Sequence, residues 1–193
     1  MEQHFNTPAE VIDNNMKAGE GKAHLPLGKM ILLGIMAGAF IALGGATSST
    51  AAHAIDNVGL ARFVAGIIFP VGLMIIVFVG GELFTGNCLM VMALLERRIT
   101  PAQLLRNWLT VYLGNAMGGA AVAALAVYSH TASLFGDGLA RSMVSIAESK
   151  AALGAGDAFL RGVLCNFLVC LAVWMAAASK RAEGKVIALF FPI

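Results

Sequence analysis

The fold of this chain is decided by the stretch Val77-Phe78-Val79-Gly80-Gly81-Glu82-Leu83-Phe84-Thr85-Gly86-Asn87-Cys88-Leu89-Met90. Apolar residues flank it over 63–79 and 88–95, and together they exceed the roughly 20 residues of one bilayer crossing. Unwound backbone in hydrocarbon is tolerated only where protein buries it or where it lines a watery cavity. The stretch therefore predicts a broken helix whose interruption lines a solute path. The alternative is one helix that ends at Gly80, followed by a cytoplasmic turn and a short amphipathic piece.

The composition places the whole chain in the membrane. It has 193 residues, of which 59% are hydrophobic and 12% charged, with a mean hydropathy of +0.81. These values predict an all-α polytopic membrane protein. The net charge of +2 comes without a basic patch interleaved with aromatic residues, so nucleic-acid binding is excluded. The three cysteines form no CxxC pair and predict neither a metal site nor a disulfide framework.

The polar N-terminal arm, residues 1–28, contains one helix start. Thr7-Pro8-Ala9-Glu10 combines an N-cap, a first-turn proline and a capping-box acid. A short amphipathic helix should follow and lie on the membrane surface or against a neighbouring subunit. The arm lacks the apolar core of a cleavable signal peptide.

Residues 29–193 form the expected membrane domain. Besides the broken segment, spans are expected at about 30–47, 102–128 and 158–178, with a short amphipathic helix at 142–152. The pairs Gly34/Gly38 and Gly114/Gly118 have the small-xxx-small spacing that allows close helix packing. A further span opens at Val186 but has only eight residues before Ile193, so we expect the chain to be a truncated part of a longer protein.

The basic residues predict the orientation. Nine of the 13 Lys and Arg residues fall on the side of the N-terminus when the broken segment counts as one crossing. Positive charge marks the cytoplasmic side, so the N-terminus should be cytoplasmic.

Four polar residues are candidates for the path. Glu82 is ionisable at membrane depth, which suggests function, but it could instead cap the unwound backbone. Thr85 could donate a hydrogen bond to an anion where a half-helix begins. Asn166 lies inside a span and could line the path or bond another helix, and Lys150, ahead of that span, could attract anions or be a solvated bystander. Phe69, Leu73 and Phe84 flank the break and could form apolar constrictions or simply pack in the core.

Three motifs carry a family resemblance. Gly-Glu-Leu-Phe-Thr-Gly at 81–86, Asn-Trp-Leu-x-Val-Tyr-x-Gly-Asn at 107–115 and Leu-Cys-Asn-x-Leu-Val-Cys-Leu-Ala-Val-Trp-Met at 164–175 closely resemble the formate/nitrite transporter family. The resemblance implies an aquaporin-like fold of two inverted three-helix repeats with the second and fifth helices broken, and a ring of five subunits. The first repeat would cover about 29–128, and the second, covering about 157–193, would be incomplete. Formate, nitrite or hydrosulfide would pass through a pore in each subunit.

The resemblance also assigns roles to residues. It places the family's loop threonine at Thr85, its vestibule lysine at Lys150 and its pore asparagine at Asn166. Apolar constriction residues fall at Phe69, Leu73, Leu83 and Phe84, with Val169 beside the asparagine. The family's central histidine belongs to a Gly-x-Glu-His-Ser-x-Ala-Asn motif in the fifth helix, which this chain does not reach, and none of the four histidines falls in an expected span.

These features predict a mechanism and a setting. Anions would concentrate at the vestibule and pass the apolar constrictions as the neutral acid, because burying an isolated ion is very costly. We expect no enzyme activity and no cofactor, a homopentamer in the bacterial inner membrane, and a lipid bilayer and a small monovalent anion as partners. A neutral-solute channel of the aquaporin type is the alternative, although its twin Asn-Pro-Ala boxes are absent. A haem-bearing anchor subunit is disfavoured because no expected span carries a histidine ligand.

Overall fold

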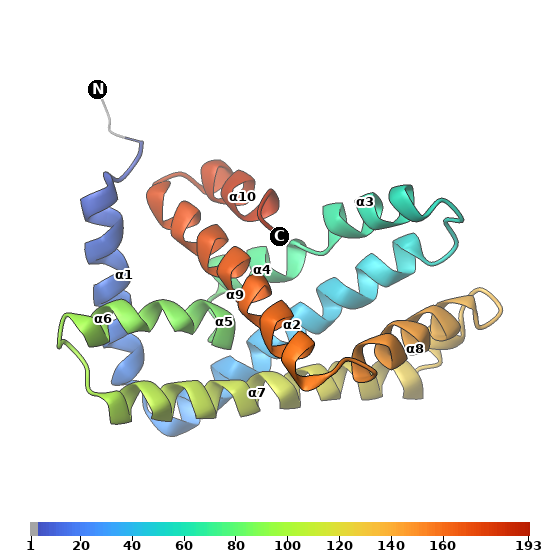
Figure 1. Ribbon diagram of the computed structural model, residues 1–193, viewed down its shortest axis with the longest axis horizontal. Coiled ribbons are helices and arrows are strands. Elements are labelled where there is room, and N and C mark those ends of the chain that lie inside the picture. Colours follow the sequence, from blue (N-terminus) through green and yellow to red (C-terminus); the bar gives the residue numbers. More distant parts are fainter. Residues whose placement is uncertain (1–3) are drawn as a thin grey trace.

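The computed structural model describes residues 4–193 as an all-helical protein, and within that range the only strand-like pairing is an isolated bridge between Phe5 and Ser179 (Figure 1). The helices are α1 (Pro8–Ala23), α2 (Leu27–Ala52), α3 (Val58–Ile68), α4 (Val71–Val79), α5 (Phe84–Asn87), α6 (Val91–Leu95), α7 (Pro101–Tyr128), α8 (Gly138–Ala151), α9 (Ala155–Ala178) and α10 (Ala182–Phe190), with 3-10 turns at Cys88–Met90 and Thr131–Ser133.

Four apolar segments are long enough to cross a membrane. They are Leu27–Ala52, Val58–Val79, Pro101–Tyr128 and Ala155–Ala178, and they confirm the multi-pass membrane protein expected from the composition. The first span continues past its expected end near residue 47. The polar end of this helix is held against α3, where the Ser48 hydroxyl donates to the Ala65 carbonyl at 2.9 Å.

The closest helix pair is α2 with α7, and glycines make the approach possible. An added Cβ at Gly34 would lie 3.3 Å from the Gly114 Cα, and one at Gly38 would overlap the Asn115 carbonyl. A Cβ at Gly118 would overlap the Ile35 carbonyl. The two small-xxx-small pairs therefore meet each other, which confirms that this spacing serves close helix packing.

The N-terminal arm packs on its own chain. The capping box at Thr7 is present as expected. The amphipathic helix α1 lies against α6, where an added Cβ at Gly19 would be 3.2 Å from the Ala93 Cβ. Ahead of it, the Asn6 backbone N–H donates to the Ala178 carbonyl of α9 at 2.8 Å. Part of α1 is therefore covered by α6 and the end of α9 within the chain, and its placement on the membrane surface or against a neighbouring subunit stays a prediction.

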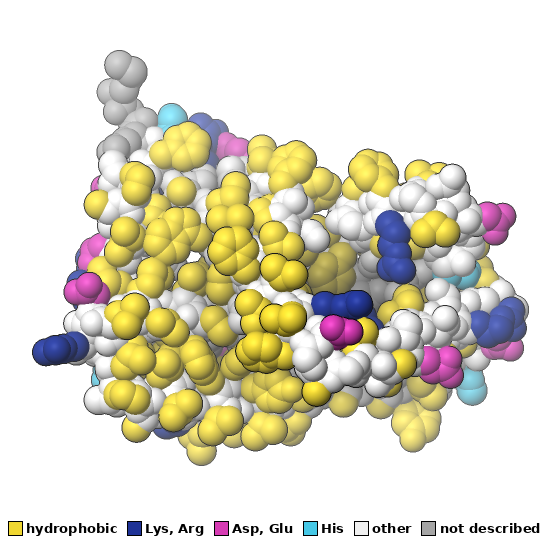
Figure 2. Space-filling view, in the orientation of Figure 1, with side chains coloured by type: hydrophobic (Ala, Val, Ile, Leu, Met, Phe, Trp, Pro, Cys, Tyr) yellow, Lys and Arg dark blue, Asp and Glu magenta, His cyan; other side chains and the backbone are white. Residues whose placement is uncertain are grey.

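Helix α9 stays largely uncovered. Apolar side chains such as Phe159, Leu164 and Phe167 are more than half exposed, and Figure 2 shows hydrophobic side chains over much of this face. Its preceding helix, α8, includes most of the expected amphipathic segment and lies at the Ala52 end of α2, where Ser142 and Ser145 share a cavity with Ser48 and Ala52. Helices α1 and α8 thus sit at opposite ends of α2.

Candidate functional site

The apolar run of the second span is interrupted at residues 80–83. Helix α4 ends at Val79, Gly80 has φ 89°, and α5 begins at Phe84. A positive φ of this size is readily adopted only by glycine. The break lies beside Asn115, near the middle of the 28-residue α7. A turn at the membrane surface, the alternative, would instead lie level with the end of that helix.

The unwound backbone is satisfied from two neighbouring helices. The Glu82 N–H donates to the Leu33 carbonyl of α2 at 3.2 Å. The Asn115 amide of α7 donates to the Glu82 carbonyl at 2.8 Å and accepts from the Phe84 N–H at 2.9 Å. The same amide donates to the Gly34 carbonyl at 2.8 Å. Asn115 therefore stabilises the break by supplying hydrogen-bond partners to its backbone. Backbone groups inside a membrane need such partners.

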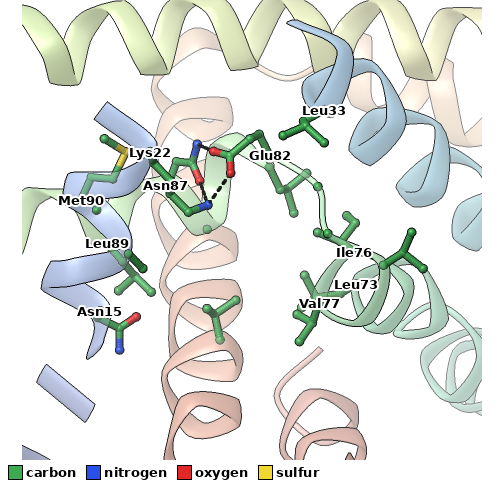
Figure 3. A pocket seen from close by; sticks show the side chains of 18 residues that line it. Asn15, Lys22, Leu33, Leu73, Ile76, Val77, Glu82, Asn87, Leu89 and Met90 are labelled. Carbon is green, nitrogen blue, oxygen red and sulfur yellow. Dashed lines mark hydrogen bonds and ion pairs between the residues drawn. The ribbon is translucent and has the colours of Figure 1, made fainter. Parts of the chain in front are cut away.

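The Glu82 side chain belongs to a buried polar network (Figure 3). Lys22 Nζ of α1 lies 3.0 Å from Glu82 Oε1 and 2.7 Å from Asn87 Oδ1. The Asn87 amide donates to Glu82 Oε2 at 2.7 Å and to Asn107 Oδ1 at 2.8 Å. The carboxylate bonds to these side chains and to no backbone N–H of the break in the described part of the chain, so the alternative in which Glu82 caps the unwound backbone is wrong, and its place on the path stays a prediction. One positive and one negative group leave the network neutral.

A cavity of about 380 Å³ opens beside this network, between α1, α4 and the break. Figure 3 shows Leu73, Ile76 and Val77 on one side of it and Asn15 and Leu89 on the other. Its walls are mostly apolar, with the Lys22–Glu82–Asn87 network at one end.

The predicted constriction residues divide into two groups. Leu73 and Leu83 pack with Val169 of α9 in one apolar cluster. Phe84 lies outside it, with its ring 5.4 Å from the Tyr112 ring and 6.0 Å from the Trp108 ring of α7. Leu83 and Phe84 diverge because Leu83 has extended backbone, in which successive side chains point to opposite sides.

Phe69 also lies outside that cluster. It stands at the junction of α3 and α4, and its ring faces Gly45 of α2, 4.0 Å from an added Cβ there. The structure therefore brings together only three of the five predicted constriction residues.

Thr85 and Asn166 lie in a second polar cluster, between α5 and α9. The Asn166 amide donates to Cys88 Sγ at 3.0 Å and accepts from Cys170 Sγ at 3.2 Å. Cys170 Sγ also lies 3.2 Å from the Thr85 carbonyl oxygen. The Thr85 hydroxyl is buried and has no hydrogen-bond partner within residues 4–193. Lys150 is exposed in the last turn of α8 and joins neither cluster.

Lys22, Asn87, Asn107 and Asn115 were not predicted from the sequence. Asparagines inside apolar spans are a usable signal, since polar groups there need partners. Lys22 could also have been found from the sequence, because the residues around it are repeated 128 positions later around Lys150. Identical residues occupy the pairs Lys22/Lys150, Ala23/Ala151, Leu25/Leu153, Gly28/Gly156, Leu32/Leu160 and Gly34/Gly162. Both lysines end a surface helix that precedes a span.

Metal binding has no support among residues 4–193, where no three His, Cys, Asp or Glu side chains gather. Cys88, Cys165 and Cys170 are free thiols.

Comparison with known proteins gives a consistent result. The sequence profile described as "Formate/nitrite transporter" matches residues 9–193. The chain is 38% identical to a probable formate transporter of Methanothermobacter thermautotrophicus, over 98% of this chain and 76% of that protein. It is 35% identical to the formate channel FocA of Haemophilus influenzae, over 97% of this chain and 66% of that protein.

Solved structures agree. An FNT family ion channel superimposes with a TM-score of 0.86 at 29% identity, covering 95% of this chain and 74% of that one. A pentameric formate channel with formate bound gives a TM-score of 0.78 at 29% identity, covering 86% of this chain and 66% of that one. This chain thus spans about two thirds to three quarters of the length of these proteins.

Proposed function

The chain belongs to the formate/nitrite transporter family, and on that premise we propose that it is a channel subunit that passes small monovalent anions, with formate as the first substrate and nitrite or hydrosulfide as alternatives. The relatives are channels and transporters. The proposed setting is a homopentamer in the cell inner membrane with a cytoplasmic N-terminus and no enzymatic role. The pentameric assembly of a structural neighbour supports the subunit number.

The observation that carries the proposal is the Thr85 hydroxyl. It is buried beside the break without a hydrogen-bond partner in the described part of the chain. Leaving a buried hydroxyl unpaired costs about 1–3 kcal/mol, so unpaired buried hydroxyls are uncommon in folded proteins and those that occur often have a functional role. A passing anion offers the acceptor that this hydroxyl lacks.

The charge balance at the break suits an anion. An isolated Glu82 carboxylate would repel one, but Lys22 pairs with it at 3.0 Å. At the far end of α2, the exposed Lys150 ammonium raises the local concentration of anions.

Between these ends, an anion must pass the apolar cluster that contains Leu73, Leu83 and Val169. Burying an isolated ion there is costly, so the solute crosses this zone as the neutral acid. The proposal therefore includes coupling to a proton, with flux rising as the pH falls toward the pKa of the acid.

The test is formate flux into proteoliposomes that contain the full-length protein. Thr85→Val keeps the shape and removes the hydroxyl, so flux should fall roughly tenfold or more, as expected for losing a hydrogen bond to a charged group. Thr85→Ser is the matched control and should keep most of the flux. Equal flux in the two variants would remove Thr85 from the path. Water or glycerol flux that exceeds formate flux would favour the aquaporin-like alternative.

A further inference from the structure

We propose that Cys88 and Cys170 are positioning residues that fix the orientation of the Asn166 amide, so that it offers an N–H rather than a carbonyl oxygen to the anion. This inference rests on the proposed function. It concerns residues from two elements distant in sequence, the 3-10 turn after α5 and the middle of α9.

Cys88 determines which end of the amide faces it. Its thiol donates to the Phe84 carbonyl, with 3.5 Å between Sγ and the oxygen. A thiol has one hydrogen, so toward Asn166 Cys88 Sγ can only accept, and it does so from Nδ2 at 3.0 Å. Rotating the amide by half a turn would set its oxygen against the sulfur lone pairs, unless Cys88 gave up the Phe84 carbonyl.

Cys170 supports the same orientation from the next turn of α9. Its Sγ lies 3.2 Å from Asn166 Oδ1 and 3.2 Å from the Thr85 carbonyl oxygen. A thiol has one hydrogen, so Cys170 donates either to the amide oxygen or to the Thr85 carbonyl, and the two acceptors lie at the same distance. When that hydrogen is on Oδ1, the two thiols hold opposite ends of one amide.

The consequence concerns charge. With Oδ1 on Cys170 and one N–H on Cys88, the second N–H of Asn166 has no partner in residues 4–193. Thr85 contacts the same cluster through its backbone carbonyl, and its buried hydroxyl is a second donor without a partner in residues 4–193. Two donors attract an anion, whereas a reversed amide would replace one of them by a partial negative charge.

Cys165 provides an internal control. It precedes Asn166 directly on α9, but it is exposed and makes no hydrogen bond in the described part of the chain. A general effect of changing a thiol in this helix would appear at Cys165 as well.

The experiment compares Cys88→Val, Cys88→Ser and Cys165→Val in the full-length protein, each with Asn166 and with Asn166→Ala. Valine matches the size of the thiol but cannot hydrogen-bond, whereas serine both donates and accepts. Cys88→Val should lower formate flux in proteoliposomes by about threefold to tenfold, the effect of one hydrogen bond. Cys88→Ser and Cys165→Val should keep the parent's flux. Cys170→Val should give a smaller loss, because Cys88 still orients the amide.

The Asn166→Ala background distinguishes a role of Cys88 in orienting the amide from a general role in the structure. Without the amide, Cys88→Val should cause no further loss of flux. A further loss in that background, or equal flux for the Val and Ser variants at 88, would overturn the assignment. A parent protein that conducts no formate would instead refute the proposed function, and this assignment with it.

Discussion

Replacing Lys22 by Met should destabilise the protein far more than the same change at Lys17, although both lysines lie on α1 and both form an ion pair. The Lys22 side chain is 29% exposed and its partner Glu82 is 8% exposed. The Lys17 pair with Asp13 is exposed by 65% and 42%. Removing one partner of a buried pair costs about 3–5 kcal/mol because an uncompensated charge stays inside.

The partial exposure of Lys22 lowers that expectation, since water can reach the vacated site. We therefore expect Lys22→Met to cost about 2–3 kcal/mol, at or just below that range. An exposed pair contributes little, so Lys17→Met should have almost no effect on stability. The loss expected for Lys22→Met is the larger of the two because Lys22 bonds both Glu82 and Asn87, and Asn87 in turn bonds Glu82.

The assay is a double-mutant cycle on the full-length protein in detergent, with thermal or denaturant unfolding of Lys22→Met, Glu82→Gln and the double variant. Glutamine keeps the shape of Glu82 but not its charge, so the double variant should be more stable than the sum of the two single losses predicts. Strict additivity would mean that the two charges do not interact, and an equal loss for Lys17→Met would refute the argument from burial.

Three further changes test other parts of the structure. Gly118→Ala should cost about 1–3 kcal/mol, because its methyl would overlap the Ile35 carbonyl, whereas Gly119→Ala has open space and should be neutral in the same unfolding assay. Asn115→Leu leaves three backbone groups at the break and on α2 without their partner, so protease cleavage near residue 82 should increase, and unchanged cleavage would show that the amide is dispensable. Asp13 of α1 also pairs with Arg98, which follows α6, at 3.6 Å. The hydrogen bond from Lys17 holds the pKa of Asp13 below its ordinary value of 3.8, so the contribution of Asp13 to the docking of α1 is fully present above that value and is lost as the pH falls below it. Amide hydrogen exchange in α1 that already rises between pH 7 and 5, after correction for the intrinsic rate, would contradict this.

Much of the architecture was predictable from local sequence. The spans near 102–128 and 158–178 were placed within a few residues, and the capping box at Thr7 is present. The ends of a helix can be predicted from local sequence because each backbone N–H bonds to the carbonyl four residues earlier. The end of the first span was missed, because Ser48 is stabilised in the helix by the distant Ala65 carbonyl.

The candidate site was predictable only in part. Thr85 and Asn166 do lie in one cluster, whereas Phe84 packs on α7 and Lys150 stands apart. Two adjacent residues, Leu83 and Phe84, face different helices, and no pattern in one segment shows which neighbour each will meet.

The sequence by itself determined that this is a multi-pass membrane protein with a helix interrupted at Gly80 and Gly81, because a bilayer requires each span to pair its own backbone. Only the tertiary structure decided that Lys22, 60 positions ahead of Glu82, neutralises its carboxylate, and that Asn115 of α7 pairs the unwound backbone. Such partners depend on how the helices pack side by side. That packing is set by how well whole helix surfaces fit together, and the sequence of a single helix does not show it.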